Sequence, residues 1–349
     1  MLAYMQFPEW IQPEVIPGLP LLRWYGLMYI LAFGTAYAMF IVQVKKDKLK
    51  IESDDVMSFF LWAIVGLLIG ARVFATLFFD ASGFYLRNPH LILLPFDENW
   101  NFVGFRGMNY YGGVAGAIVG MYLYTKMNKI NLLEWGDMLA VAIPLGYTFG
   151  RLGNFINQEL YGRITAAATG IIFPRAQPVP VDNPYVQEVA ADAGIELPAS
   201  GLFNMPRHPT QIYEALLEGP LLFLVMWFVF RTRKPFHGFL IGIYIIGYGF
   251  VRFWVDYLRM PLHGDFALEL SSVDNPPYVF QSMLDFIASQ FWALGMVAGG
   301  ALFIIVLAQM YKRNMIVDPS VPATAKVTDQ KSDRSSSEAR RRRKKLRGK

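Results

Sequence analysis

Long apolar runs recur along the chain and alternate with short polar stretches. A helix needs about 20 apolar residues to cross the hydrocarbon core of a bilayer. Seven runs approach that length, although the third is shorter than the others. The predicted spans cover residues 21–43, 56–79, 111–126, 137–157, 210–231, 238–258 and 284–311. The pattern therefore predicts an all-α polytopic membrane protein with seven transmembrane helices.

Basic residues gather in every second loop. The stretches KKDKLK, KMNK, RTRK and YKRN follow spans one, three, five and seven, whereas the opposite loops hold isolated arginines in longer segments. Because cytoplasmic loops carry the excess of Lys and Arg, the N-terminus is predicted to lie outside and the C-terminus in the cytoplasm. Residues 158–208 form the largest outside segment, and we expect them to form a small periplasmic cap between the fourth and fifth helices.

The chain ends in a basic tail. Residues 315–349 hold 11 Lys or Arg and 4 Asp or Glu, so they contribute +7 and leave −2 on residues 1–314. This Ser-rich, charged composition predicts a disordered cytoplasmic tail near anionic lipid headgroups, and no nucleic acid is expected as a partner. Residues 1–314 are expected to form one transmembrane domain. The first ten residues have no basic region ahead of an apolar stretch, so no cleavable signal peptide is expected.

The composition narrows the chemistry. The 349 residues are 54% hydrophobic and 17% charged, a balance typical of polytopic membrane proteins. There is no cysteine, which excludes disulfides, a thiol nucleophile on the protein and a Cys-ligated metal. The four histidines are scattered without ligand spacing, so no metal and no other cofactor is expected.

Polar side chains interrupt the outer part of two predicted spans. Span four ends in GRLGNFINQELYGR. Helical spacing puts Arg151, Asn154, Gln158 and Tyr161 on one face, with Asn157 beside them. In span six, polar residues at i, i+4, i+8 and i+11 form a single stripe: Tyr248, Arg252, Asp256 and Arg259. At a rise of about 1.5 Å per residue, Arg151 lies roughly 21 Å and Arg252 roughly 22 Å from the inner ends of their spans, toward the outer leaflet.

Simpler explanations exist for some of these charges. Arg252 and Asp256 could pair at i,i+4 on one helix, and Arg72 of span two could snorkel toward the interface. Tyr111, at the start of span three, could anchor the aromatic belt.

Arg151 is harder to explain in this way. No acid lies on its face within the span, so its charge indicates an anionic ligand, and the outer leaflet offers lipid phosphate. Acids inside an apolar helix usually pair with bases. We therefore expect Glu214 and Glu218, at i,i+4 in span five, to hold the arginines of spans four and six in place.

Five stretches follow one another in a family-specific order: RWYGLMY, YYGGVAG, GRLGNFINQELYGR, RHPTQIYEALLEG and GYGFVRFWVDYLR. On these signatures the chain resembles the prolipoprotein diacylglyceryl transferase family from residue 23 to about residue 259. The resemblance implies a multi-pass enzyme of the bacterial inner membrane with its active site toward the outer leaflet. Such an enzyme transfers the diacylglyceryl group of phosphatidylglycerol to the lipobox cysteine of a preprolipoprotein and releases glycerol 1-phosphate. Its partners would be phosphatidylglycerol, lipobox peptides and membrane lipids.

The family's important positions are carried over residue by residue. The resemblance implies roles for Tyr25, Arg151, Asn154, Glu159, Tyr248, Arg252, Asp256 and Arg259. We expect phosphatidylglycerol to contact Tyr25, Arg151, Asn154, Asn157, Tyr248, Arg252 and Arg259. The residues expected to act in catalysis are Arg151, Arg252, Tyr111, Glu159 and Asp256.

The reaction has two requirements that these residues could meet. The thiol, with a reference pKa of about 8.5, must lose its proton, and the departing phosphate must be stabilised. Arginine offers phosphate a permanent, forked contact, so Arg151 and Arg252 are assigned to the phosphate, with Asn154 as a neutral donor. Asp256 and Glu159 would orient the arginines or accept a proton.

Two positions depart from the family pattern. The chain has Asp256 where the family often has Glu, and Tyr111 where it commonly has His. A phenol with a reference pKa of about 10 is a poor base at neutral pH. Arginines near the thiol are therefore expected to lower its pKa instead.

Two other classes of protein remain open at this point. Intramembrane arginines and acids also mark transporters, here one for an anionic lipid or metabolite, including a flippase. No repeated halves are apparent, and the polar groups cluster on one side of the bilayer. A membrane scaffold that docks partners through its tail is the other alternative.

Overall fold

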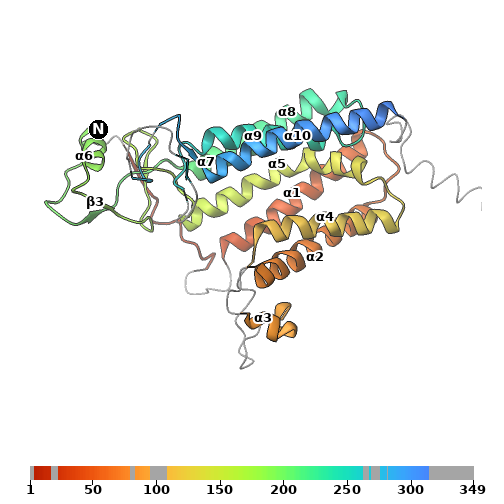
Figure 1. Ribbon diagram of the computed structural model, residues 1–349, viewed down its shortest axis with the longest axis horizontal. Coiled ribbons are helices and arrows are strands. Elements are labelled where there is room, and N and C mark those ends of the chain that lie inside the picture. The colour runs from red at the N-terminus through yellow and green to blue at the C-terminus, as the bar shows by residue number, and fades with distance from the viewer. Residues whose placement is uncertain are drawn as a thin grey trace, which may run out of the picture. The chain divides into compact units, whose positions relative to one another are not determined.

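The computed structural model describes residues 4–16, 23–78, 83–94, 108–261, 267–268, 276–280 and 282–313 (Figure 1). The predicted tail, 315–349, lies outside these ranges. The chain divides into two compact units. The first comprises Met1–Met39 and Asp137–Ile316, and the second comprises Phe40–Gly136 and Val317–Lys349.

Helices account for most of the described chain. They coincide with the predicted spans as α1 (Trp24–Lys46), α2 (Ser53–Phe78), α4 (Tyr110–Met127), α5 (Leu132–Asn157), α9 (Phe239–Val255) and α10 (Ala288–Lys312). The fifth span is a series of helical turns: α7 (Thr210–Leu216), the π-helical η2 (Leu217–Leu221), α8 (Leu222–Val225), the π-helical η3 (Met226–Phe230) and the 3-10 turn η4 (Arg231–Arg233).

Four of these stretches, within the described residues, are long and apolar enough to cross a membrane. They are Trp24–Lys46, Ser53–Phe78, Thr210–Arg233 and Ala288–Lys312, and α9 is a shorter apolar helix. The expectation of a mostly helical membrane protein is therefore confirmed. Seven crossings and their orientation stay a prediction.

In the first unit, close backbone contacts and one buried acid hold the helices together. A Cβ on Gly146 of α5 would lie 2.7 Å from the carbonyl oxygen of Ala32 in α1, so the two backbones approach closely. The fully buried carboxylate of Asp137 accepts hydrogen bonds from three backbone N–H groups where α9 begins, those of Gly238, Leu240 and Ile241, at 2.9–3.2 Å. It thereby satisfies donors that a helix start otherwise leaves unpaired.

A kink in the fifth span brings it against α5. Gly219, which precedes Pro220, has non-helical dihedral angles of φ −96° and ψ −106°. A Cβ on Gly219 would lie 2.0 Å from Oγ1 of Thr148 in α5, so only glycine fits at this crossing. The kink follows directly after Glu214 and Glu218, and it positions this acid pair beside α5 and α9.

The cap, 158–208, has a small hydrophobic core of its own. The helix α6 (Pro184–Ala193) is capped by Asn183, and its inner face packs with Ile164, Val179 and Met205. Two-residue strands complete the cap, so this part of the fold is not purely helical. They pair β1 (Met5–Gln6) in parallel with β2 (Ile171–Ile172), and β3 (Val179–Pro180) antiparallel with β4 (Leu202–Phe203). A third such pair, β5 (Ala267–Leu268) with β6 (Phe286–Ile287), precedes α10.

In the first unit of Figure 1, α5, α9 and α10 run alongside one another, and β3 and α6 lie beyond the end of α5. The polar end of α5 therefore meets the cap.

The second unit is built around a close pair of helices, α2 and α4. Glycines of one helix face glycines of the other: Gly66 and Gly70 against Gly112, Gly116 and Gly120. Small residues let helices approach closely in membranes, which accounts for the Gly-rich start of the third span. Two short elements, α3 (Phe84–Arg87) and η1 (Pro89–Ile92), follow α2.

Arg72 of α2 is used within the second unit. Its side chain is buried, and its guanidinium donates to the carbonyl oxygen of Ile92 at 2.8 Å and to the hydroxyl of Tyr85 at 3.1 Å. These contacts are local and structural, so Arg72 holds the segment after α2 instead of snorkelling.

Replacing Gly116 by alanine should destabilise the second unit. The added Cβ would lie 2.1 Å from the carbonyl oxygen of Gly66, and forcing the helices apart costs about 2 kcal/mol. Thermal unfolding in detergent should show a lower midpoint for Gly116→Ala. Gly299→Ala is the matched control, because a Cβ on Gly299 has nothing within 4 Å. Equal midpoints for the two variants would contradict the packing described here.

Candidate functional site

Three arginines converge on one buried acid in the first unit. Glu214, on α7, is fully buried. Its Oε2 lies 2.9 Å from Nε of Arg151 on α5, and its Oε1 lies 2.6 Å from Nη1 of Arg252 on α9. Arg259, just past α9, places Nη1 3.4 Å from the same Oε1. Glu214 therefore joins arginines from separate parts of the chain.

Two further acids balance the charge of this cluster. Oδ1 of Asp256 lies 3.1 Å from Nε of Arg252, and Oε1 of Glu218 lies 3.9 Å from Nη1 of Arg252. All three acids are fully buried, whereas the side chains of the three arginines remain 10–12% exposed. Pairing of this kind is what allows charges to persist in a medium of low dielectric constant. The i,i+4 pair of Arg252 with Asp256 and the ion pairs of Glu214 with both spans are thus observed.

Two tyrosines support the arginine of α5. The hydroxyl of Tyr147 accepts hydrogen bonds from the guanidinium of Arg151 and lies 3.2 Å from the hydroxyl of Tyr248. The Arg151 guanidinium also lies over the Tyr147 ring, 4.8 Å from its centroid. Tyr147 was missed in the sequence, although it lies four residues before Arg151 and hence on the same helical face.

A line of amides connects Arg151 to Glu159. Nη1 of Arg151 donates to Oδ1 of Asn154 at 3.3 Å, and Nδ2 of Asn154 donates to Oε1 of Glu159 at 2.7 Å. Asn157 donates to the same carboxylate oxygen at 3.4 Å. Gln211 of α7 holds the backbone by donating to the carbonyl oxygen of Glu159 at 2.8 Å. The structure therefore brings Arg151, Asn154, Asn157 and Glu159 together.

The predicted positions of Gln158 and Tyr161 on the Arg151 face are wrong. Tyr161 lies beyond the helix, and its ring stacks on that of Phe173 in the cap. The helix ends at Asn157, and Gln158 adopts a left-handed φ of 58°. Its side chain accepts a hydrogen bond from the backbone N–H of Arg175 at 3.0 Å and is buried against the cap. Helical periodicity no longer applies beyond the last turn, so the shared face stops one residue earlier.

Tyr25, the second residue of α1, lies at the same end of the first unit. Its ring packs beside Gly153, whose added Cβ would lie 3.2 Å from the ring, and its hydroxyl lies 3.1 Å from that of Tyr29. Gly153 thus leaves room for the tyrosine next to Asn154.

Two buried arginines of the cap were not anticipated. Arg163 donates to the carbonyl oxygens of Arg259 and Val279, each at 3.1 Å, and burial lowers the pKa of its guanidinium to about 10. Arg207 is fully buried, stacks on Tyr161 and donates to the carbonyl oxygen of Gln177 at 2.7 Å. Burial also lowers the pKa of Arg207. Arg163 therefore fixes the backbone from which the Arg259 side chain reaches Glu214.

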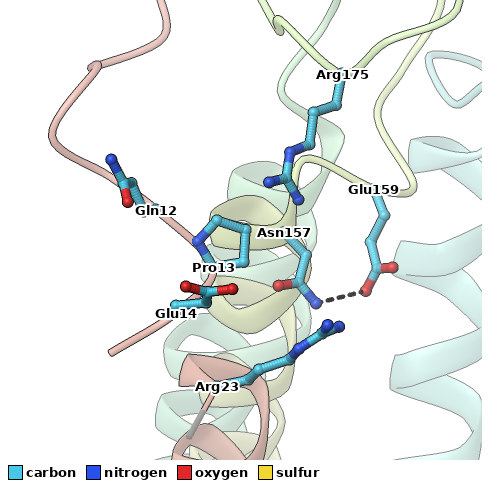
Figure 2. A pocket seen from close by; sticks show the side chains of 7 residues that line it. All are labelled: Gln12, Pro13, Glu14, Arg23, Asn157, Glu159 and Arg175. Carbon is cyan, nitrogen blue, oxygen red and sulfur yellow. Dashed lines mark hydrogen bonds between the residues drawn. The ribbon is translucent and has the colours of Figure 1, made fainter. Parts of the chain in front are cut away.

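A polar cavity of about 350 Å³ opens at the end of the line of amides that connects Arg151 to Glu159 (Figure 2). Two of the residues that line it, Asn157 and Glu159, belong to that line of amides. The other lining residues come from the N-terminal segment, the start of α1 and the cap: Gln12, Pro13, Glu14, Arg23 and Arg175.

Tyr111 belongs to the second unit. It is the second residue of α4, and its side chain is 59% exposed. Asn109 caps this helix by accepting a hydrogen bond from the backbone N–H of Gly112 at 3.1 Å.

Comparison with known proteins gives one consistent result. The family model described as prolipoprotein diacylglyceryl transferase matches residues 15–308. The chain is 42% identical over 324 residues to the phosphatidylglycerol–prolipoprotein diacylglyceryl transferase of Treponema pallidum (strain Nichols), which covers 89% of this chain and 97% of that protein. It is 46% identical over 280 residues to the protein of the same name from Treponema denticola, covering 75% of this chain and 81% of that protein. The protein of that name from Helicobacter pylori is 40% identical over 243 residues, covering 68% of this chain and 77% of that protein. The chain belongs to the prolipoprotein diacylglyceryl transferase family.

Proposed function

We propose that this chain transfers the diacylglyceryl group of phosphatidylglycerol to the lipobox cysteine of preprolipoproteins, the first step of bacterial lipoprotein maturation. Membership of the family and the names of relatives that are 40–46% identical support this activity. The absence of cysteine from the sequence is compatible with it, because the nucleophilic thiol belongs to the substrate.

The reaction exchanges one bond for another. The thiolate sulfur attacks the glycerol carbon that carries the phosphoester, a C–S bond forms, and the bond from that carbon to the ester oxygen breaks. The electron pair leaves with the oxygen, so glycerol 1-phosphate departs as an anion and the thiol proton is released. The enzyme must therefore stabilise negative charge on the phosphate as the C–O bond breaks.

Arg151 and Arg252 are suited to this task. The observation that carries the proposal is their joint approach to Glu214 from separate helices, with the acid fully buried and the arginine side chains 11–12% exposed. The observed contacts of Arg252 use Nε and Nη1, so among the described residues its Nη2 has no partner and can donate to a phosphate oxygen. Arginine pairs phosphate through two parallel hydrogen bonds, which fixes the orientation of the ester as well as its charge.

The remaining residues have supporting roles in this proposal. Asn154 donates to the phosphate as a neutral group, and Tyr25, Asn157, Tyr248 and Arg259 complete the binding site for phosphatidylglycerol. Asp256 orients Arg252 through its 3.1 Å contact, and Glu159 orients Asn154 or accepts the thiol proton.

The proposed setting is the bacterial inner membrane. Seven crossings would put the N-terminus and the cap, 158–208, on the periplasmic side, and the tail, 315–349, in the cytoplasm near anionic lipids. The site then lies at the level of the outer leaflet, where both phosphatidylglycerol and an exported preprolipoprotein are within reach. The short basic loops KKDKLK, KMNK and RTRK support this orientation.

Tyr111 is proposed as a catalytic residue, at the position where the family commonly has histidine. Its hydroxyl would donate a hydrogen bond to the reacting groups, while nearby arginines lower the pKa of the thiol. Replacing Tyr111 by phenylalanine should lower kcat by about tenfold, the effect of one lost hydrogen bond to a charged group, and Tyr111→His should retain activity. Turnover of the two variants tests this assignment. Wild-type turnover by Tyr111→Phe would remove Tyr111 from the catalytic set.

One assay separates transfer from transport. Purified full-length protein is mixed with phosphatidylglycerol and a synthetic lipobox peptide, and the products are followed by mass spectrometry. A transferase gives a thioether-linked diacylglyceryl peptide and glycerol 1-phosphate in equal amounts, and Ser in place of the lipobox Cys prevents both. Movement of lipid or phosphate across reconstituted vesicles without a thioether product would instead support the transporter alternative.

A further inference from the structure

The cavity beside Glu159 has a polar lining that suits a small ligand with an anionic end and hydroxyl groups. Its volume of about 350 Å³ lies at the lower end of the range for small-molecule pockets, roughly 300–1,000 Å³. Two guanidinium groups, those of Arg23 and Arg175, offer donors to an anion. Apart from Pro13, the rest of the lining consists of carboxylates and amides that can bind hydroxyl groups: Gln12, Glu14, Asn157 and Glu159.

The two arginines face the same point in the cavity. Figure 2 shows the guanidinium groups of Arg23 and Arg175 turned toward Asn157 from opposite sides. Arg23 comes directly before α1, and Arg175 belongs to the cap. Among the described residues, the Arg175 guanidinium makes no ion pair, so its forked donors remain available to a ligand. This arrangement matches bidentate binding of phosphate oxygens.

The cavity adjoins the arginine cluster through one shared residue. Oε1 of Glu159 accepts hydrogen bonds from Asn154, which contacts Arg151, and from Asn157, which lines the cavity. The hydrogen-bonded chain Asn154–Glu159–Asn157 therefore connects Arg151 to the lining of the cavity. The end of α5 lies at this boundary.

Charge gives the leaving group a reason to move. In the lipid the phosphodiester carries one negative charge, whereas the released monoester has a second pKa near 6 and gains a further charge at neutral pH. Glu214 and Asp256 lie fully buried behind the arginines, where water does not screen their repulsion of this extra charge. The cavity also holds two carboxylates, those of Glu14 and Glu159, beside its two arginines, but Arg23, Arg175 and Glu159 are exposed, so water screens this repulsion and solvates the second charge.

We propose that this cavity receives the glycerol 1-phosphate leaving group after the C–O bond breaks, with Arg23 and Arg175 on its phosphate and Asn157 and Glu159 on its hydroxyls. The inference rests on the proposed transfer activity. It adds a product site that shares Asn157 and Glu159 with the proposed lipid site but binds the phosphate through two arginines of its own, Arg23 and Arg175.

The test measures binding of glycerol 1-phosphate with neither lipid nor peptide present, by calorimetric titration of the full-length protein. The Kd should rise by about tenfold in Arg175→Gln, the effect of losing a charge-assisted hydrogen bond, and by less in Arg175→Lys, which keeps the charge. Arg313→Gln is the matched control, because it removes an exposed arginine directly after the C-terminal end of α10. This variant should keep the wild-type Kd. Inorganic phosphate should bind more weakly than glycerol 1-phosphate, because it lacks the diol.

Several results would overturn the assignment. They are the absence of binding to the wild-type protein, an unchanged Kd in Arg175→Gln, or inorganic phosphate binding as tightly as glycerol 1-phosphate. A rise in the KM for phosphatidylglycerol that equals the rise in Kd would also overturn it, because the cavity would then hold the lipid headgroup. Failure of the transfer activity is read separately, from the absence of a thioether product in the wild-type assay.

Discussion

Replacing Glu214 by glutamine should lower kcat by at least about 100-fold and destabilise the protein. Glu214 pairs Arg151, Arg252 and Arg259 at 2.9, 2.6 and 3.4 Å, so its neutralisation leaves three arginines facing two acids. Removing the charge of one partner in a buried ion pair lowers the free energy of unfolding by about 3 kcal/mol or more. The guanidinium groups of Arg151 and Arg252 would also lose the common orientation that Glu214 gives them. Removal of one preorganised contact in a water-poor site typically lowers the rate by about 100-fold.

Turnover and thermal unfolding should be measured together for this variant. Glu214→Asp keeps the charge but shortens the reach, so it should recover stability more fully than kcat. Glu188→Gln, which removes an exposed acid of α6 in the cap, is the matched control and should behave as the wild type. A Glu214→Gln protein with wild-type turnover would show that the arginines do not depend on this acid.

Replacing Arg252 by lysine should lower kcat by about 100-fold with a smaller change in the KM for phosphatidylglycerol. Lysine keeps the positive charge but loses the planar fork. In Arg252, Nη1 contacts Glu214, Nε contacts Asp256, and Nη2 is left to donate to a phosphate oxygen. The single ammonium group of lysine cannot reach all three partners at once. The contact to the departing phosphate strengthens as charge develops, so its loss appears mainly in kcat.

Initial rates of thioether formation over a range of lipid concentrations separate the two constants. Arg313→Lys makes the same chemical change at an exposed position and should keep both constants at their wild-type values. If Arg252→Lys raised KM alone, Arg252 would contribute to binding of the lipid and not to departure of the phosphate.

Much of the architecture follows from patterns within single segments. Apolar runs of membrane length predicted the long helices, because each depends only on its own hydrophobicity. The spacing of the stripe from Tyr248 to Arg259 also offered an i,i+4 pair of Arg252 with Asp256 as the simpler explanation of these charges, and this contact is observed at 3.1 Å.

The joining of three arginines by Glu214 could be anticipated only in outline. Sequence spacing indicated that acids of the fifth span pair with bases of other spans, but not which carboxylate would meet which guanidinium. That choice depends on the kink at Gly219 and on its contact with Thr148, which involve residues about 70 positions apart. Packing between distant segments carries no periodic signal.

Local breaks in helical geometry account for the other differences. Gln158 was assigned to the Arg151 face, but its left-handed backbone turns it to the cap. Arg163 and Arg207 donate mainly to backbone carbonyl oxygens, a role that residue type alone does not reveal. Tyr147 lay on the predicted face and could have been found by extending that face one turn toward the start of the helix.

The central claim is that Arg151 and Arg252 together stabilise the phosphate as it leaves. A single-turnover experiment with chemical quench tests it most directly, because formation of labelled glycerol 1-phosphate on enzyme saturated with phosphatidylglycerol and peptide then reports bond breaking without the later departure of the product. We expect Arg151→Lys and Arg252→Lys each to slow this formation by about 100-fold. Formation at the wild-type rate in either variant would contradict the claim.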